Sequence, residues 1–217
     1  MPHRTPCSDV APNVVLHRRF LSPGLCAVIS SEMSGTTGSP AAVVDPDGVH
    51  QVREDQRRTR TIQLPLSLFE HLVERLRGLI PVLSSQFQLK LADVVGPEAL
   101  TYDPGDFFRS HRDRADNQRL SGSLSERLLS AVMFLNDWSP VGEGESGFSG
   151  GVLKLYPSGT SPTSLGRALP ICGQAGTLVI FPSEMFHEIS VVTRGRRQSL
   201  VAFFVGPGEG HVSVGGR

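Results

Sequence analysis

The spacing of apolar residues predicts a helix in the stretch SPGLCAVISSEM, which starts at Ser22. Ser22 is suited to cap this helix, and Pro23 to occupy its first position, because the amide hydrogen that proline lacks would be unpaired there. Leu25, Val28 and Ile29 follow at helical spacing and form an apolar stripe. We therefore expect an amphipathic helix at this point of the chain.

A second helix is predicted for SLFEHLVERLRG, which starts at Ser67. Ser67 and Glu70 have the spacing of a capping box, in which each side chain pairs with the backbone amide of the other residue. Apolar residues repeat at helical intervals at Phe69, Leu72, Val73 and Leu76. Gly78 is suited to end the helix, and residues 80–91 are expected to continue as a further helix after Pro81.

The periodicity changes from about residue 98, where short apolar runs bounded by Gly, Pro, Asn and Asp begin. These runs are 99–102, 129–137, 150–157, 176–182, 187–193 and 197–205. Strands of this length, separated by turns and not by helices, predict an antiparallel sandwich or barrel. Residues 114–128 and 139–150 interrupt the pattern, and we expect both to be loops near one mouth of the barrel.

The expected organisation is one integrated domain of mainly β structure with N-terminal helices. Residues 1–97 form an N-terminal segment with support helices, 98–208 the core, and 209–217 a tail. The length of 217 residues, of which 39% are hydrophobic, is enough for one sizeable core. No repeat of fixed period is visible.

The charge and cysteine content of the chain indicate which binding partners and which cellular compartment to expect. Lys and Arg number 21, as do Asp and Glu, so no net charge favours nucleic acid or an anionic membrane. The basic run at 57–60 is predicted to be a solvent-exposed loop. Three scattered cysteines, no apolar core for a signal peptide and no apolar stretch long enough to cross a bilayer predict a soluble cytoplasmic protein. The oligomeric state is not predicted.

A candidate metal site comes from the sequence HRD. In an extended strand residues two apart point the same way, so His111 and Asp113 would face one point while Arg112 faces away. His187 opens another predicted strand and is the best third ligand among the remaining histidines. Two histidines and one carboxylate form the facial triad typical of non-heme Fe(II) oxygenases. The alternative is that His111 and Asp113 belong to an ordinary polar turn.

Arg197 is a candidate anion-binding residue. If the predicted strands 187–193 and 197–205 are adjacent and antiparallel, the turn between them returns Arg197 to the metal site. Its planar guanidinium binds carboxylates through two hydrogen bonds, and Ser199, two residues on, points to the same face. Together they predict a pocket for a dicarboxylate; the alternative is a surface arginine in a basic turn.

Four segments in unbroken order between residues 98 and 205 carry a family resemblance. LTYDPGDFFRSHRD, AVMFLND, GGVLKLYP and AGTLVIFPSEMFHEISVVTRGRRQSL resemble the core of the prolyl-4-hydroxylase-like 2-oxoglutarate/Fe(II)-dependent dioxygenases. The resemblance implies a double-stranded β-helix, or jelly roll, with helices buttressing one sheet. It also implies iron on His111, Asp113 and His187 and the distal carboxylate of 2-oxoglutarate on Arg197, with Arg196 the less favoured alternative.

The resemblance extends to the rest of the cosubstrate pocket with one departure. Tyr102 matches an aromatic position that lines this pocket in relatives, although a packing role at a strand end is the alternative. Some relatives have a tyrosine on the strand that here reads AVMFLND, where Met133 and Phe134 stand instead. Ser199 or Tyr102 could then supply the missing hydrogen bond to the cosubstrate.

The implied activity is hydroxylation of an unactivated C–H bond with release of succinate and CO2. Fe(II), 2-oxoglutarate and O2 are the implied cofactor and cosubstrates, and ascorbate is a further candidate. The substrate could be a prolyl or other amino-acid residue of a peptide or protein. Alternatives left open are a hydroxylase of a free amino acid or small metabolite, a jelly-roll metal oxygenase that does not use 2-oxoglutarate, and a non-catalytic binding module.

Overall fold

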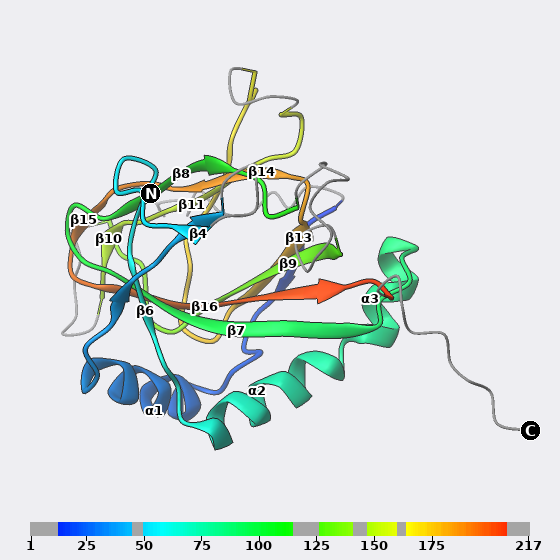
Figure 1. Cartoon of the computed structure of the whole chain (residues 1–217), viewed down its shortest axis with the longest axis horizontal. Coiled ribbons are helices and arrows are strands. Elements are labelled where there is room, and N and C mark those ends of the chain that lie inside the picture. The colour runs from blue at the N-terminus through cyan, green and yellow to red at the C-terminus, as the bar shows by residue number, and fades with distance from the viewer. Residues whose placement is uncertain (1–12, 45–49, 115–125, 141–146, 160–163, 208–217) are drawn as a thin grey trace, which may run out of the picture.

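Two antiparallel β-sheets face each other in the protein, and helices cover the outer side of one of them (Figure 1). The structure, a computed structural model, describes residues 13–44, 50–114, 126–140, 147–159 and 164–207. In spatial order, the seven-stranded sheet contains β1 (Val15–His17), β13 (Leu178–Pro182), β9 (Arg127–Phe134), β16 (Arg197–Val205), β7 (Asp93–Tyr102), β6 (Arg60–Ile62) and β2 (Ser39–Pro40).

The second sheet has five strands, and two short ribbons complete the β structure. The five-stranded sheet contains, in spatial order, β12 (Leu169–Ile171), β11 (Leu153–Tyr156), β14 (Phe186–Ile189), β8 (Phe107–His111) and β5 (Arg57–Arg58). The ribbons pair β10 (Ser149–Gly150) with β15 (Val192–Arg194) and β3 (Val43–Val44) with β4 (His50–Gln51). The predicted mainly β jelly roll with buttressing helices is confirmed.

Helix α1 (Pro23–Ser34) begins as the sequence predicts. The Ser22 hydroxyl accepts a hydrogen bond from the Leu25 amide at 3.2 Å, and Pro23 occupies the first helical position. The buried face differs from the expected stripe, because Val28 is 51% exposed while Cys26 and Met33 are buried beside Ile29. The stripe is therefore rotated from the one the apolar spacing predicted.

Helix α2 (Leu66–Arg77) does not use the predicted capping box. Pro65, with φ −53° and ψ 140°, occupies the cap position, and no side chain caps the helix. The fixed φ of proline leads the chain into the helix at Leu66, so Ser67 lies inside the first turn and cannot act as the cap. The predicted end is confirmed, since the Gly78 amide donates to the Glu74 carbonyl oxygen at 3.1 Å.

Helix α3 (Ile80–Phe87) is shorter than the predicted 80–91. Gln88 adopts a left-handed conformation with φ 54° and ψ 42°, and its amide bonds the Ser84 carbonyl. A residue in this conformation closes an α-helix. The chain then enters β7 at Asp93, and the helices lie along the outer face of the seven-stranded sheet (Figure 1). No helix in the described ranges is long and apolar enough to cross a membrane.

Side chains of β16 alternate between two environments. Leu200, Ala202 and Phe204 join the apolar cluster that the helices cover. Arg197 and Ser199 line the interior between the two sheets. Because successive side chains of a strand point to opposite faces, one strand supports the helix-covered core and also supplies polar groups to the interior.

The strands 187–193 and 197–205 are not paired, so the condition under which a turn would return Arg197 to the metal site is not met. The first of these is split into β14, in the five-stranded sheet, and β15, which pairs with β10; β16 lies in the other sheet. Gly195 (φ 67°) makes the turn between β15 and β16, where a Cβ atom would collide with the Gly147 carbonyl oxygen. The chain therefore crosses between the sheets where a hairpin was expected.

Residues before 98 contribute to both sheets as well as supplying helices. β1, β2 and β6 belong to the seven-stranded sheet, and β5 is an edge strand of the five-stranded sheet. The division at residue 97 stays a prediction. The tail 209–217, residues 115–125 of the predicted loop 114–128 and residues 141–146 of the predicted loop 139–150 lie outside the described residues. β9 already begins at Arg127, and β10 occupies Ser149–Gly150.

Candidate active site

His111 and His187 are direct neighbours across two strands. They are paired positions in the antiparallel register of β8 and β14, and their ring centroids lie 4.1 Å apart. Side chains at paired positions of adjacent strands point to the same face of a sheet. Strand pairing, and not sequence proximity, therefore joins the first and third predicted ligands.

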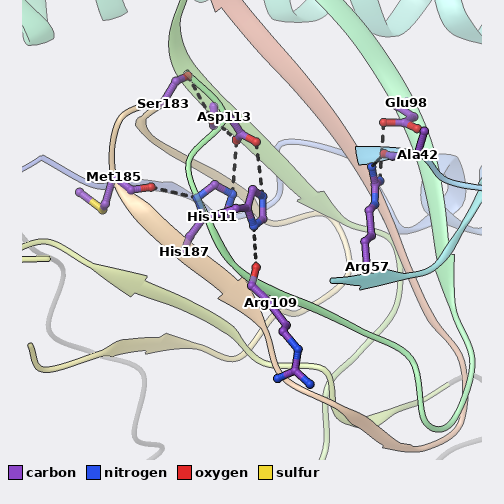
Figure 2. A network of polar contacts seen from close by, with 10 residues as sticks. Ala42, Arg57, Glu98, Arg109, His111, Asp113, Ser183, Met185 and His187 are labelled. Atoms are coloured by element: carbon purple, nitrogen blue, oxygen red, sulfur yellow. Dashed lines mark hydrogen bonds and ion pairs between the residues drawn. The ribbon is translucent and has the colours of Figure 1, made fainter. Parts of the chain in front are cut away.

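Asp113 lies beyond the end of β8, so the predicted extended HRD strand is wrong in detail. The Asp113 and Arg114 amides both donate to the Ser183 carbonyl oxygen, at 2.9 and 3.0 Å. The Ser130 hydroxyl donates to the Asp113 carboxylate at 2.6 Å and is itself 2.9 Å from the Ser183 hydroxyl. These bonds hold the bend after His111 and direct the carboxylate toward the two imidazoles (Figure 2).

Hydrogen bonds to backbone carbonyls orient both imidazole rings. His111 Nδ1 lies 2.8 Å from the Arg109 oxygen, and His187 Nδ1 lies 3.0 Å from the Met185 oxygen. When each Nδ1–H donates to its carbonyl, each Nε2 keeps a lone pair for a ligand. The two Nε2 atoms point at the Asp113 carboxylate from 3.5 and 3.3 Å (Figure 2).

The resulting cluster has the size and donor set of a cation site. One ligand atom from each of His111, Asp113 and His187 lies within 4.8 Å of the others. Two imidazole nitrogens and one carboxylate oxygen suit Fe(II) and leave part of its coordination sphere open. The residues therefore fit the metal that the sequence predicts.

The charges of the cluster are coupled. Burial lowers the pKa of His111, and the neighbouring His187 lowers it further. Burial alone would raise the pKa of Asp113 and lower that of His187, but their mutual attraction outweighs it, so the Asp113 pKa lies well below its usual value and the His187 pKa above its own. Asp113 is thus an anion at neutral pH, ready for a metal ion or a proton on His187.

Arg197 is a buried cation that lacks partners for most of its hydrogen-bond donors. Only 1% of the residue is exposed. Nη1 donates to the Ser199 hydroxyl at 2.7 Å, while Nε and Nη2 have no partner among the described residues. Burial lowers its pKa to about 10. Buried charged donors without partners are costly, so this arrangement indicates a site for an anion, as predicted for a carboxylate.

Tyr102 and Phe134 enclose the Arg197 guanidinium, whose carbon lies 5.1 Å from each ring centroid. Arg197 and Tyr102 are paired in the register of β16 and β7, which explains why both point inward. Arg196 points away and binds the partly exposed Asp103 at 2.6 Å. The predicted preference for Arg197 over Arg196 agrees with this geometry.

One cavity of about 800 Å³ connects the two halves of the site. The six predicted residues that line it are His111, Asp113, His187, Tyr102, Arg197 and Ser199. The histidines come from the five-stranded sheet and the arginine and serine from the seven-stranded sheet. Arg197 thus shares a cavity with the triad because the sheets face each other, although β14 and β16 do not pair.

Several residues that support or contact the triad are not identified by any pattern in the sequence. Ser130 and Ser183 support Asp113 without any motif that identifies them, and Phe108 stacks on His111 with centroids 3.6 Å apart. The prediction of an exposed loop at 57–60 is wrong, since Arg57 is only 9% exposed and lies on β5. Residues 57–60 alternate between buried and exposed in the structure, but their sequence, RRTR, contains no apolar residue, so no apolar alternation predicts the strand.

Comparisons with known proteins match the chain to a family of oxygenases. Residues 97–205 match the family model of the 2OG-Fe(II) oxygenase superfamily. Over 105 residues, which are 48% of this chain, the sequence is 35% identical to a PKHD-type hydroxylase of Beijerinckia indica. The matched part is 39% of that protein, so the chain spans about two fifths of the length of this relative.

Solved structures share the fold at low sequence identity. A prolyl-4-hydroxylase of Pseudomonas putida has a TM-score of 0.68 and 24% identity, with 90% of this chain and 94% of that one covered. A prolyl hydroxylase of Trichoplax adhaerens, in complex with a hypoxia inducible factor peptide fragment, has a TM-score of 0.65 and 14% identity, with 90% and 84% covered. With the family match over half of the sequence, the chain belongs to the 2OG-Fe(II) oxygenase superfamily.

Proposed function

We propose that this chain is an Fe(II)- and 2-oxoglutarate-dependent hydroxylase. His111, Asp113 and His187 are assigned to the iron, and Arg197, with Ser199 and Tyr102, to 2-oxoglutarate. The observation that carries the proposal is the shared cavity, in which three convergent ligand atoms and a buried guanidinium with unpaired donors occur together. A jelly-roll oxygenase without 2-oxoglutarate would leave those donors of Arg197 unexplained.

Bound Fe(II), 2-oxoglutarate and O2 together supply the oxidising chemistry that hydroxylates a C–H bond, with succinate and CO2 as coproducts. The protein contributes position and charge. The carbonyls of Arg109 and Met185 hold the imidazoles with Nε2 toward the metal position, and Ser130 holds the Asp113 carboxylate. Arg197 binds and orients the distal carboxylate of the cosubstrate, so that the reacting groups meet in one geometry.

For the substrate we propose a class of molecules and not a single compound. The Trichoplax structure contains a peptide, and both solved structures described above are named prolyl hydroxylases. A prolyl or other amino-acid residue of a peptide or protein is therefore the leading substrate, and a free amino acid or small metabolite is the alternative. A cavity of about 800 Å³ accepts either. A cytoplasmic location remains an expectation from the scattered cysteines of the sequence.

The test is succinate formation by the full chain reconstituted with Fe(II), 2-oxoglutarate and O2. Asp113→Ala should reduce it to background, and Arg197→Ala should raise the 2-oxoglutarate requirement strongly. Arg77→Met is a matched control, because Arg77 lies on the exposed surface and binds Asp93 and Glu74. Succinate formation that persists in Asp113→Ala would contradict the iron assignment, and an unchanged 2-oxoglutarate requirement in Arg197→Ala would contradict the cosubstrate assignment.

A further inference from the structure

The cavity is strongly basic although the chain has no net charge. Among the residues that the structure describes, seven arginines and two carboxylates, Asp113 and Glu98, line it. Asp113 is assigned to the metal and Arg197 to 2-oxoglutarate, which leaves six arginines and one carboxylate in the described lining. One of the six, Arg53, is paired with Asp55 at 3.0 Å. A cavity lined mainly by one sign of charge raises the local concentration of ligands of the opposite sign.

Arg57 is the most buried of the remaining arginines, and its charge is incompletely paired. Nη1 donates to the Ala42 carbonyl oxygen at 2.9 Å, and Nε has no partner among the described residues. Nη2 lies 3.8 Å from Glu98 Oε2, too far for a hydrogen bond. Glu98 accepts a bond from Thr61 at 2.6 Å through its other oxygen. Glu98 therefore compensates the charge of Arg57 only in part.

One aromatic ring, that of Phe108, lies between Arg57 and the triad. Its guanidinium carbon lies 4.8 Å from the centroid of Phe108, which in turn stacks on His111 at 3.6 Å. The pairing of β5 with β8 explains this placement, because Arg57 and Phe108 are partners in the register. Arg57 and Glu98 lie on the other side of the view from Asp113 and His187 (Figure 2).

Arg127 is a second incompletely paired cation in the same cavity. Its Nε has no partner among the described residues, and its guanidinium carbon lies 3.7 Å above the Phe203 ring. Burial lowers its pKa, and the positive charge of Arg57 lowers it further, against the opposite influence of Asp113 and Glu98. An anion bound near both arginines would relieve this repulsion and supply acceptors for the unpaired donors.

We propose that the substrate carries a carboxylate, which Arg57 and Arg127 bind while the carbon to be hydroxylated faces the metal position. The inference rests on the proposed function and specifies its substrate class. The carboxylate could belong to a small organic acid or to an acidic side chain of a peptide. In either case it is distinct from 2-oxoglutarate, which is assigned to Arg197.

The experiment is isothermal titration of the full chain loaded with Mn(II) and saturating 2-oxoglutarate under nitrogen, so that no turnover occurs and Arg197 is occupied. The small-acid probes are hippurate and its neutral amide. The peptide probes are Ac-Glu-Pro-Glu-NH2 and Ac-Gln-Pro-Gln-NH2. We expect the acidic member of at least one pair to bind about tenfold or more tighter than its neutral partner, and less tightly at high salt. The preferred pair identifies the source of the carboxylate.

Arg57→Met should abolish the preference for the acidic probe, Arg57→Lys should keep part of it, and Arg77→Met, which removes the same charge from the surface, should retain it. If Arg57→Met does not fold, Arg127→Met tests the same preference through the other arginine of the proposed subsite. Equal binding of the acidic and neutral probes, or no binding of any probe by the loaded wild type, would overturn the proposal. Failure of Mn(II) or 2-oxoglutarate to bind would instead contradict the proposed function. Even then, a preference for the acidic probe that is lost in Arg57→Met would support the carboxylate subsite.

Discussion

Gly151 lies directly against Arg197: a Cβ atom built on Gly151 would be 2.9 Å from Arg197 Cδ and 3.0 Å from Val192 Cγ2. The position of the buried guanidinium therefore depends on the absence of a side chain at residue 151. Gly151 also has a φ of 55°, which disfavours other residues.

Gly151→Ala should displace Arg197 and raise the 2-oxoglutarate concentration needed for half-maximal binding by about tenfold, the size of one lost charged hydrogen bond. Titration of the Mn(II)-loaded chain measures it. Gly105→Ala is the matched control, since Gly105 also has a positive φ, 94°, but a Cβ there would meet nothing within 4 Å. Equal weakening in both variants would mean that backbone strain, and not contact with Arg197, is responsible.

Ser130→Ala should lower the affinity for Mn(II) by about tenfold, because the Asp113 carboxylate loses its 2.6 Å hydrogen bond. Ser183→Ala removes only the hydroxyl contact with Ser130 and keeps the backbone carbonyl that holds Asp113, so its effect should be smaller. Metal titrations of the two variants, with thermal unfolding as a check on folding, measure this. The reverse order of effects would contradict the role given to Ser130.

Mn(II) affinity should fall as the pH is lowered from about 7.5 to 5.5, and the fall should begin at a higher pH than an ordinary histidine would give. Burial lowers the pKa of His187, but attraction to Asp113 outweighs burial and raises the pKa above its usual value. A protonated imidazole cannot bind a metal ion. Titrations in buffers of different ionisation enthalpy would detect the released proton. A metal affinity that is independent of pH over this range would exclude His187 as a ligand.

In the metal-free chain, the raised pKa of His187 makes the folded state more stable at low pH, whereas metal binding is weakened there. A raised pKa means that the folded state binds the proton more tightly than the unfolded state. The resulting stabilisation is fully present below the unfolded pKa of His187 and is lost as the pH rises through its folded value. Mn(II) should therefore stabilise the chain more at neutral than at acid pH, as thermal unfolding with and without the metal can measure.

Arg196→Gln should change 2-oxoglutarate binding little and cost at most about 1 kcal/mol of stability, because its ion pair with Asp103 is exposed. Arg197→Gln, the same substitution one residue later, should weaken 2-oxoglutarate binding strongly. Parallel titrations of the two variants test the direction in which each side chain points. Comparable losses in both would contradict the assignment of the distal carboxylate to Arg197.

Local patterns in the sequence predicted much of this site. Two-residue spacing identified His111 with Asp113 and Arg197 with Ser199, and the periodicity after residue 98 predicted a β sandwich with helices preceding it. The predictions that were wrong concern the ends of helices and strands, where more than one nearby residue can make the terminating contact. Pro65 replaced Ser67 at the start of α2, and Asp113 lies past the end of its strand because Ser183 holds the bend.

What the sequence alone determined is therefore the set of chemical groups and the class of fold, since residue type and periodicity are local properties. Only the tertiary structure decided which groups meet. His111 faces His187 through strand pairing, and Arg197 shares their cavity from the opposite sheet. Arg57 is buried on an edge strand where an exposed loop was expected. These are contacts between segments distant in the chain, and they depend on sheet register and on the packing of two sheets, which no local pattern specifies.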